Sequence, residues 1–217
     1  MANKAGGGIA NGGTPTDYVI LGGSVTITNS MFANNMAQSY GGGFHNAYEG
    51  TATITNSTFA YNLAGRGGGA IYNGVYSGDD AGSSVQVNNS TITANVAAQP
   101  GGGIYNAEGS TVTLSNSVVA FNTSGDCAAD DAVMTNWDGS TNLDSDGTCP
   151  DSAPMTGLDE QPGRNGGPTF TYALLDGSSA TNAGDPTLCP STDQRGAVRS
   201  APCDIGAFEY GAELPGD

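Results

Sequence analysis

A short acidic segment in the C-terminal half has the spacing of a calcium-binding loop. Residues 142–147, Asn-Leu-Asp-Ser-Asp-Gly, place side-chain oxygens at alternate positions before a glycine, as in the first half of an EF-hand loop. The twelfth position is Ala153 rather than a bidentate glutamate, so Asp151 or Asp138 would have to substitute for it. An Asp-Gly turn that needs no ion explains the same residues. The calcium ligands that we expect are Asn142, Asp144, Asp146 and Asp151.

Two glutamates have a spacing that could suit a glycoside hydrolase. Glu49 and Glu108 follow equivalent asparagines in repeats that are two coils apart. At about 4.8 Å per coil they would stand roughly 10 Å apart, the outer limit for two catalytic carboxylates. A polysaccharide lyase needs a base near calcium, and the repeats offer only Lys4 and Arg66. We therefore expect no enzymatic activity and no required cofactor, with a lyase or hydrolase as the alternative.

The charged string 193–196, Asp-Gln-Arg-Gly, has two interpretations. Asp193 and Arg195 could act in catalysis, or an Arg–carboxylate pair could lock a charged turn. The string lies between two cysteines in a loop-rich segment, and this favours the structural role.

Four cysteines lie in the C-terminal part of the chain. An even number of cysteines in an extracellular-looking segment favours disulfides over a metal, and the lone His45 cannot complete a zinc set. Four cysteines allow three pairings. Sequence order suggests the pairs Cys127–Cys149 and Cys189–Cys203.

Repeats supply the elements that must position these residues. Three consecutive glycines followed by an asparagine occur four times, and an Asn-Ser pair comes after each copy. The Asn-Ser pairs recur at intervals of 27, 33 and 27 residues. A fixed period of this size indicates a solenoid. The pairs begin at Asn29, Asn56, Asn89 and Asn116.

Each repeat contains three short runs with strand character, which in the fourth repeat are 104–105, 111–114 and 118–121. The run Thr-Val-Thr-Leu alternates polar and apolar residues, as a strand with one buried face does. Three strands and three turns in about 27 residues make one coil of a right-handed parallel β-helix. We therefore predict an all-β fold, with coils in residues 1–123 and a loop-rich, disulfide-stapled cap over the last coil in residues 124–217.

Asparagines and apolar residues at equivalent positions should stack from coil to coil. An Asn at the same turn of every coil can bond to its copies and to backbone groups that the turn leaves unpaired. One such ladder should contain Asn35, Asn62, Asn95 and Asn122, and a second should contain Asn11, Asn46, Asn73 and Asn106. The buried line should include Ile9, Ile27, Phe32, Phe44, Ile54, Phe59, Ile71, Val87, Ile92, Ile104, Leu114 and Val119.

The charge distribution excludes some partners. Charged residues make up 12% of the 217 residues, yet the net charge is −16. Five basic residues are too few to neutralise the phosphates of a nucleic acid. No hydrophobic run approaches the length of about 18 residues that a membrane span needs, so we expect no membrane insertion. The first five residues lack the apolar core of a signal peptide.

The C-terminal part also carries an ordered series of motifs, at residues 142–149, 165–169, 173–178, 193–196 and 203–210. Together they closely resemble the choice-of-anchor Q domain of bacterial surface proteins, and the resemblance covers nearly the whole chain. It implies an exported bacterial β-helix protein, extracellular or at the cell surface, and it implies no reaction. The family's usual start and its C-terminal anchor are missing from this sequence.

The sequence thus favours a non-catalytic structural or adhesive module. The chain begins inside a repeat, so either it is trimmed from a longer helix or its open first coil pairs head to tail with another copy in a filament. Ice binding through Thr-x-Thr rows fails, because the third repeat has Gln86 and Asn88. Glycan binding remains a rival, with stacking surfaces from Tyr40, Tyr48, Tyr61, Tyr72, Tyr76 and Tyr105.

Overall fold

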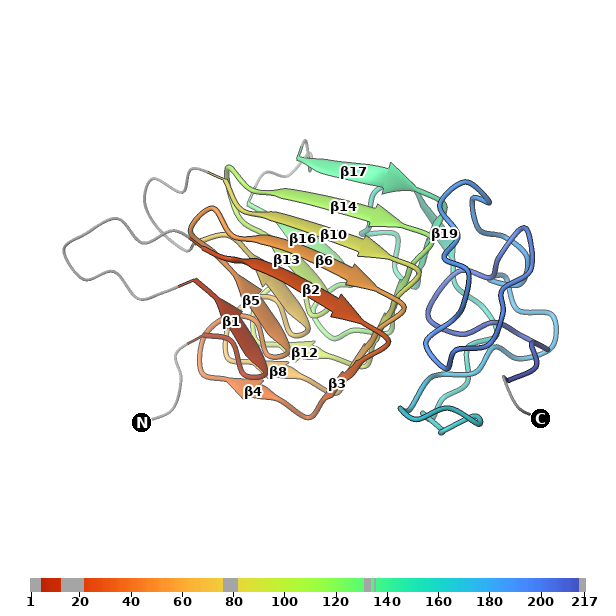
Figure 1. Ribbon diagram of the computed structural model, residues 1–217. Coiled ribbons are helices and arrows are strands. Elements are labelled where there is room, and N and C mark those ends of the chain that lie inside the picture. The colour runs from red at the N-terminus through yellow and green to blue at the C-terminus, as the bar shows by residue number, and fades with distance from the viewer. Residues whose placement is uncertain (1–4, 13–21, 76–81, 131–133, 135, 215–217) are drawn as a thin grey trace.

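The computed structural model describes residues 5–12, 22–75, 82–130, 134 and 136–214. Its strands form four parallel sheets, and no helix occurs among the described residues. Successive strands along the chain belong to successive sheets, so the chain winds as a parallel β-helix (Figure 1). The predicted fold class is confirmed.

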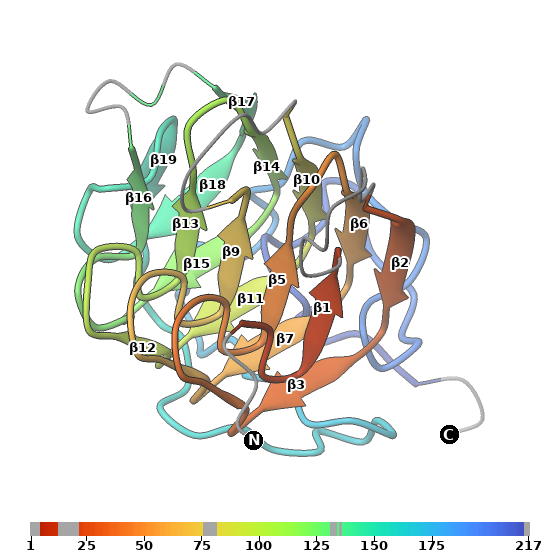
Figure 2. The same ribbon diagram turned by 90° about the vertical axis from the view of Figure 1, so that its left-hand side faces the viewer.

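Four sheets make the walls of the coil (Figure 2). Sheet B contains β1 (Ile9–Asn11), β5 (Phe44–Asn46), β9 (Ile71–Asn73), β13 (Ile104–Asn106) and β16 (Cys127–Ala129). Sheet C contains β2 (Ser24–Thr28), β6 (Thr51–Thr55), β10 (Ser84–Asn88), β14 (Thr111–Ser115) and β17 (Trp137–Ser140). Sheet D contains β3 (Met31–Ala33), β7 (Thr58–Ala60), β11 (Thr91–Thr93), β15 (Val118–Ala120), β18 (Asn142–Asp144) and β19 (Ser152–Pro154). A short fourth wall, sheet E, contains β4 (Met36–Ala37), β8 (Leu63–Ala64) and β12 (Val96–Ala97).

The three strand runs predicted for the fourth repeat correspond to β13, β14 and β15. The strands of sheet E were not predicted, because two residues are too few to show an alternating pattern.

In-register stacking builds the core. Ile27, Ile54, Val87 and Leu114 are Cα partners along sheet C, and their side chains belong to one buried cluster. Of the twelve residues predicted to be buried, Ile9 and Phe32 in the first coil are only partly covered, and the others are buried. Phe32 still stacks on Phe59, with ring centroids 4.8 Å apart.

The glycine triplets serve two purposes that the sequence suggested. Gly41 and its equivalent Gly68 have φ values of 66° and 67°, in the left-handed region that favours glycine. A Cβ on the next residue, Gly42, would lie 2.4 Å from the carbonyl oxygen of Gly69 in the following coil. The turn therefore needs glycine for its backbone angle and for the close approach of neighbouring coils.

The repeated motifs end near residue 123, but the stacked strands continue. β16 pairs with β13, β17 with β14 and β18 with β15, which makes a fifth coil without a glycine triplet or an Asn-Ser pair. β19 then adds to the outer edge of β18. Pro154 at the end of β19 has no N–H group, so this edge of sheet D is poorly suited to accept a further strand. The opposite end of the stack presents β1, β2, β3 and β4 as edge strands.

Residues 155–214, which we call the lateral segment, correct the predicted position of the cap. This segment lies along the side of the coils rather than over the last one, and Figure 1 shows it in blue beside the carboxyl ends of β2, β6 and β10. Leu174 and Ile205 of the lateral segment form a second apolar cluster with Val118 and Ala120 of β15. In the last coil the Cys127–Cys149 disulfide lies at the core, because both cysteines belong to the main core cluster.

Candidate functional site

Both predicted asparagine ladders are present. Asn35, Asn62 and Asn95 each donate from Nδ2 to Oδ1 of the next asparagine over 2.9 Å. The same Oδ1 atoms accept the backbone N–H of the preceding copy. The second ladder runs from Asn11 through Asn46 and Asn73 to Asn106, with steps of 2.8, 2.9 and 2.8 Å. These asparagines therefore provide hydrogen-bond partners for polar groups in the buried turns, which is a structural role.

A serine ladder accompanies them, which sequence reasoning overlooked. The backbone N–H groups of Ser30, Ser57 and Ser90 donate to Oγ of the next serine in the following coil. The backbone N–H of the final serine, Ser117, donates to Oδ1 of Asn142 over 3.1 Å. The repeated Ser of the Asn-Ser pair was a visible signal for this ladder. Asn142, predicted as a calcium ligand, thus ends the serine ladder with its side-chain oxygen engaged.

Three carboxylates gather at the end of the coil interior. Asp126, Asp144 and Asp146 each offer an oxygen, and these atoms lie within 4.8 Å of one another. Asp144 is the Cα partner of the buried Val119 in the preceding coil. Its side chain therefore points toward the interior of the coil. Of the predicted ligands, Asp144 and Asp146 are therefore together, while Asp151 is exposed in a separate pocket beside β18 and β19. Asp126 was not predicted, because it lies in the preceding turn.

The carboxylates are held by hydrogen bonds from the protein. Asp126 accepts bonds from Ser145 N and Oγ and from Asn122 N and Nδ2. Burial, the largest influence, raises the pKa of Asp126 above its usual value of 3.8, although these hydrogen bonds lower it. Three carboxylates in one space repel one another when ionised, and a bound divalent cation would relieve that repulsion.

The geometry of Asp193 and Arg195 favours the structural interpretation of this turn. Arg195 Nη2 lies 2.7 Å from Asp193 Oδ2, and the two side chains are 6% and 0% exposed. The guanidinium also lies 3.8 Å from the ring centroid of Phe208 and donates to the carbonyl of Glu209 over 2.7 Å. Asp193 accepts the backbone N–H of Glu209 over 3.0 Å. The motif therefore ties two parts of the lateral segment together.

A second buried ion pair anchors the lateral segment to the coils. Arg199 Nη1 lies 3.0 Å from Glu209 Oε2, and Arg199 Nη2 donates to Oδ1 of Asn56 over 3.0 Å. Thr58 Oγ1 donates to Oε1 of Gln194 over 2.6 Å. Burial, the largest influence, lowers the pKa of Arg199. These contacts join residues more than 130 positions apart in sequence.

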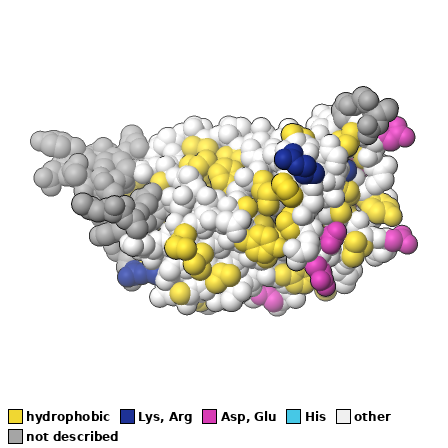
Figure 3. Space-filling view, turned by 90° about the horizontal axis from the view of Figure 1, so that it is seen from below, with side chains coloured by type: hydrophobic (Ala, Val, Ile, Leu, Met, Phe, Trp, Pro, Cys, Tyr) yellow, Lys and Arg dark blue, Asp and Glu magenta, His cyan; other side chains and the backbone are white. Residues whose placement is uncertain are grey.

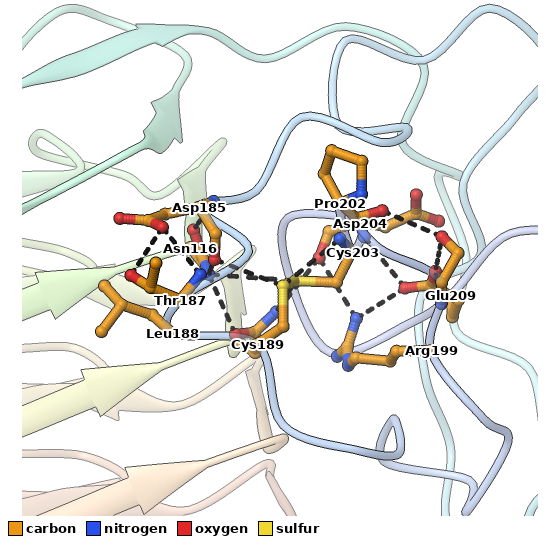
Figure 4. The surroundings of a disulfide bond; sticks show 12 residues. Asn116, Asp185, Thr187, Leu188, Cys189, Arg199, Pro202, Cys203, Asp204 and Glu209 are labelled. Carbon is orange, nitrogen blue, oxygen red and sulfur yellow. Dashed lines mark hydrogen bonds and ion pairs between the residues drawn. A yellow bond between two sulfur atoms is a disulfide. The ribbon is translucent and has the colours of Figure 1, made fainter.

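Both predicted disulfides form. Cys127–Cys149 has an S–S distance of 2.01 Å and Cys189–Cys203 one of 2.03 Å. Figure 4 shows Cys189–Cys203 between the loop at Asp185 and the buried Arg199–Glu209 pair. Asn116, directly after β14, donates from Nδ2 to the carbonyl of Asp185 over 3.1 Å. This disulfide therefore belongs to the seam between the lateral segment and the coils.

The two candidate hydrolase glutamates do not form a site with other acids. Glu49 and Glu108 are exposed in the turns after β5 and β13, with β9 between those strands. Neither belongs to the lining of the pocket at Phe121 or of the pocket at Asp151. Asp130 approaches Glu108 only through the backbone N–H, over 2.8 Å.

Most of the candidate tyrosines pack within the protein. Tyr72 stacks on Tyr105 with centroids 5.1 Å apart, and it contacts Tyr40 in a tilted arrangement with centroids 4.4 Å apart. Tyr48 is half-buried, and Tyr76 lies outside the described residues. Tyr61 differs, because its side chain is 37% exposed at the corner between sheets D and E.

A pocket of about 340 Å³ opens next to this corner. The coils contribute Thr93, Ala94 and Phe121 to its lining. The lateral segment contributes Leu158, Asp159, Glu160 and Tyr172. The face seen from below in Figure 3 carries hydrophobic side chains in its middle, with acidic side chains toward the C-terminal side.

Tyr172 has an unusual environment in this pocket. Tyr172 is 2% exposed, and its hydroxyl is buried beside the Tyr61 hydroxyl. Burial, followed by the nearby Tyr61 hydroxyl and Asp159 carboxylate, raises the pKa of Tyr172. The hydroxyl is therefore protonated at neutral pH and can both donate and accept a hydrogen bond.

Sheet C presents a flat outer face rich in hydroxyls. Because its strands are in register, outward residues form rows, one of which contains Ser24, Thr51, Ser84 and Thr111. The adjacent row contains Thr26, Thr53, Gln86 and Thr113. Rows of this kind repeat about every 4.8 Å across strands and about every 6.8 Å along them. The first four coils therefore carry an uncharged lattice of hydrogen-bonding groups.

No family model, curated protein or solved structure matches the chain. Within the described residues, no helix has the length and apolar character needed to cross a membrane.

Proposed function

We propose that this chain is a non-catalytic extracellular module that acts as a rigid structural and adhesive rod, with the outer face of sheet C as its adhesive surface. The observation that carries this proposal is the in-register lattice of exposed Ser, Thr and Gln side chains on β2, β6, β10 and β14. Side chains fixed on a sheet lose little further entropy when they bind. A regular, uncharged array of donors and acceptors fits a hydroxylated polymer such as a polysaccharide.

The interior supports the rigid character of the rod. Stacked amides and hydroxyls join the first four coils to one another at three positions, so that the turns are fastened as well as the strands. Two disulfides stabilise the fifth coil and the lateral segment. Disulfides persist mainly in oxidising compartments, which supports an extracellular location.

Binding to insoluble polysaccharides tests the adhesive surface. Thr53→Lys combined with Gln86→Lys places two cations in the centre of the lattice without altering an inward residue. We expect cellulose, chitin or another insoluble glycan to retain the native protein and to release the double variant. Gln38→Lys is a matched control, because Gln38 is exposed beyond sheet C. Equal retention of all three proteins would reject sheet C as the adhesive face, and retention of none would reject adhesion to these glycans.

A further inference from the structure

The two disulfides differ in their access to solvent. Cys127 and Cys149 are only 3% and 6% exposed, and both belong to the main core cluster. Cys203 is fully buried, but its partner Cys189 is half-buried and follows Leu188, which is 41% exposed. Thiol–disulfide exchange begins when a thiolate attacks one of the two sulfurs, so its rate depends on access to that sulfur. Of the four cysteines, Cys189 is therefore the one that a thiol in solution can reach first.

The coils supply hydrogen-bond donors to the other sulfur of this disulfide. Asn89 and Asn116, each the first residue of an Asn-Ser pair, place Nδ2 at 3.5 and 3.9 Å from Cys203 Sγ. Figure 4 shows Asn116 beside the disulfide. A disulfide sulfur is a weak acceptor, whereas a thiolate carries a full negative charge and accepts such bonds more strongly. Two amide donors are thus in place for Cys203 if its sulfur leaves as a thiolate.

The segment between the two cysteines carries several contacts of the lateral segment with the second coil. The carbonyl of Thr192 accepts Nδ2 of Asn56 over 2.6 Å, and Arg199 Nη2 donates to Oδ1 of the same asparagine over 3.0 Å. Gln194 Oε1 accepts the hydroxyl of Thr58 over 2.6 Å. A disulfide restricts the conformations of the loop that it closes. Opening this disulfide would therefore free both ends of the segment that makes these contacts.

We propose that Cys189–Cys203 is a redox-sensitive switch, which a small dithiol opens while Cys127–Cys149 stays oxidised. A thiolate of the dithiol attacks Sγ of Cys189 and forms a mixed disulfide, while the original S–S bond breaks and Cys203 leaves as a thiolate. The second thiol of the reductant then attacks the reductant's own sulfur in the mixed disulfide. This step releases Cys189 and leaves the reductant as a cyclic disulfide.

Two electrons thereby pass from the dithiol to the two cysteines, and its two protons pass through solvent to the cysteine thiolates. Residues 185–202 then loosen on the coils, because local stability depends on the contacts and constraints of each segment. The coils keep their own stacked strands and their buried Cys127–Cys149 disulfide. This switch does not depend on an adhesive role of sheet C.

Alkylation and limited proteolysis of the intact, folded chain test the proposal, with dithiothreitol as the reductant. Iodoacetamide traps the thiols as they form, and mass spectrometry of the peptides identifies each labelled cysteine. We expect Cys189 and Cys203 to be labelled at least about tenfold faster than Cys127 and Cys149. Protease cleavage within residues 185–202 should accelerate over the same range of dithiothreitol concentration. Equal labelling of the two pairs, faster labelling of Cys127 and Cys149, or labelling without faster cleavage would overturn the proposal.

Two double variants assign the effect to one disulfide. Cys189→Ser with Cys203→Ser should be cleaved within residues 185–202 as fast as the reduced native protein, and dithiothreitol should change that rate no further. Cys127→Ser with Cys149→Ser is the matched control and should keep the dependence on dithiothreitol. If this control does not fold, the order of labelling in the native chain still decides. A cleavage rate that responds to dithiothreitol in the variant without Cys189 and Cys203 would reject the switch.

Discussion

Asn122 Nδ2 donates a hydrogen bond of 2.9 Å to Oδ1 of Asp126, and this contact ends the asparagine ladder that begins at Asn35. Each amide in the ladder donates to the next coil and accepts from the previous one. The last amide needs an acceptor, and another asparagine there would bring a new donor that needs a partner in its turn. A carboxylate accepts without donating, so Asp126 can finish the chain of bonds.

Removing a central amide should destabilise the coils strongly. Asn95→Ala takes away the acceptor for the N–H and Nδ2 of Asn62 and the donor to the carbonyl of Phe59. Because these groups are buried, we expect a loss of about 3 kcal/mol or more in the free energy of unfolding. Urea denaturation measures it. Gln99→Ala, an exposed change in a loop, should cost less than about 0.5 kcal/mol, and a similar loss in both variants would contradict the structural role of the ladder.

The buried carboxylate should make stability depend on pH in a defined direction. Burial raises the pKa of Asp126 above 3.8, so the folded state holds this proton more tightly than the unfolded state. Its stabilising contribution is full below the unfolded pKa and is lost as the pH rises through the folded pKa. Asp126→Asn cannot titrate. We therefore expect the native protein to gain stability relative to this variant as the pH falls from about 7 to about 4.

Denaturation curves of the two proteins at several pH values, with a chelator present, provide the measurement. Asp204, whose pKa burial also raises, is unchanged in both proteins and cancels in the comparison. A constant difference in the free energy of unfolding across this range would show that Asp126 does not carry the effect.

Calcium should stabilise the fifth coil. Asp126, Asp144 and Asp146 bring their oxygens within 4.8 Å of one another, and a divalent cation that binds only the folded state raises the melting temperature by mass action. We predict a rise in melting temperature with millimolar calcium, and no rise in the variant Asp144→Ala with Asp146→Ala. Asp151→Ala should respond like the native protein, because Asp151 lies in a different pocket. An unchanged melting temperature of the native protein in calcium would reject this calcium site.

The lateral segment should detach when its buried arginine is replaced. Arg199→Met leaves Glu209, which is 2% exposed, without its ion-pair partner and breaks the bond to Asn56. Removing one partner of a buried pair costs about 3–5 kcal/mol. We expect limited proteolysis to cut residues 155–214 faster in this variant. Arg164→Met changes an exposed arginine that packs on Phe170 and should leave the cleavage rate as it is, whereas equal cleavage of native protein and Arg199→Met would disprove the anchoring role.

End-to-end association through the open edge would have to overcome an asymmetry between the two ends. β1, β2, β3 and β4 are free edges at one end, but β19 with Pro154 already occupies the edge of β18 at the other. Of the described strands, β16 of sheet B and β17 of sheet C are the fifth-coil edges that a head-to-tail joint could use. We predict that electron microscopy at high protein concentration shows filaments that disappear when Ala10, an exposed residue of β1, is replaced by proline, because proline removes a ladder donor. Filaments that persist in the variant would exclude β1 from the joint.

Several features that the structure contains could be read from the sequence, because they repeat. The Asn ladders, the glycine turns and the row Ile27, Ile54, Val87 and Leu114 follow from equivalent residues at a fixed period. The serine ladder was equally visible and was missed, because the Asn-Ser pairs were used only to measure the interval between repeats. The calcium segment was predicted as a local loop, so Asn142 and Asp151 were included and Asp126 was not.

The first four coils follow from the amino-acid sequence, because equivalent residues of neighbouring repeats align and set the register of the strands. The position and contacts of the non-repeated part depend on the fold of the whole chain. The contacts of Arg199 with Asn56 and of Gln194 with Thr58 span more than 130 residues, and no periodicity predicts them. The same holds for the pocket between Phe121 and Tyr172 and for Asp126 beside Asp144. These groups meet because a segment without repeats folds back on the side of the coils, and its position depends on packing complementarity rather than on a pattern along the chain.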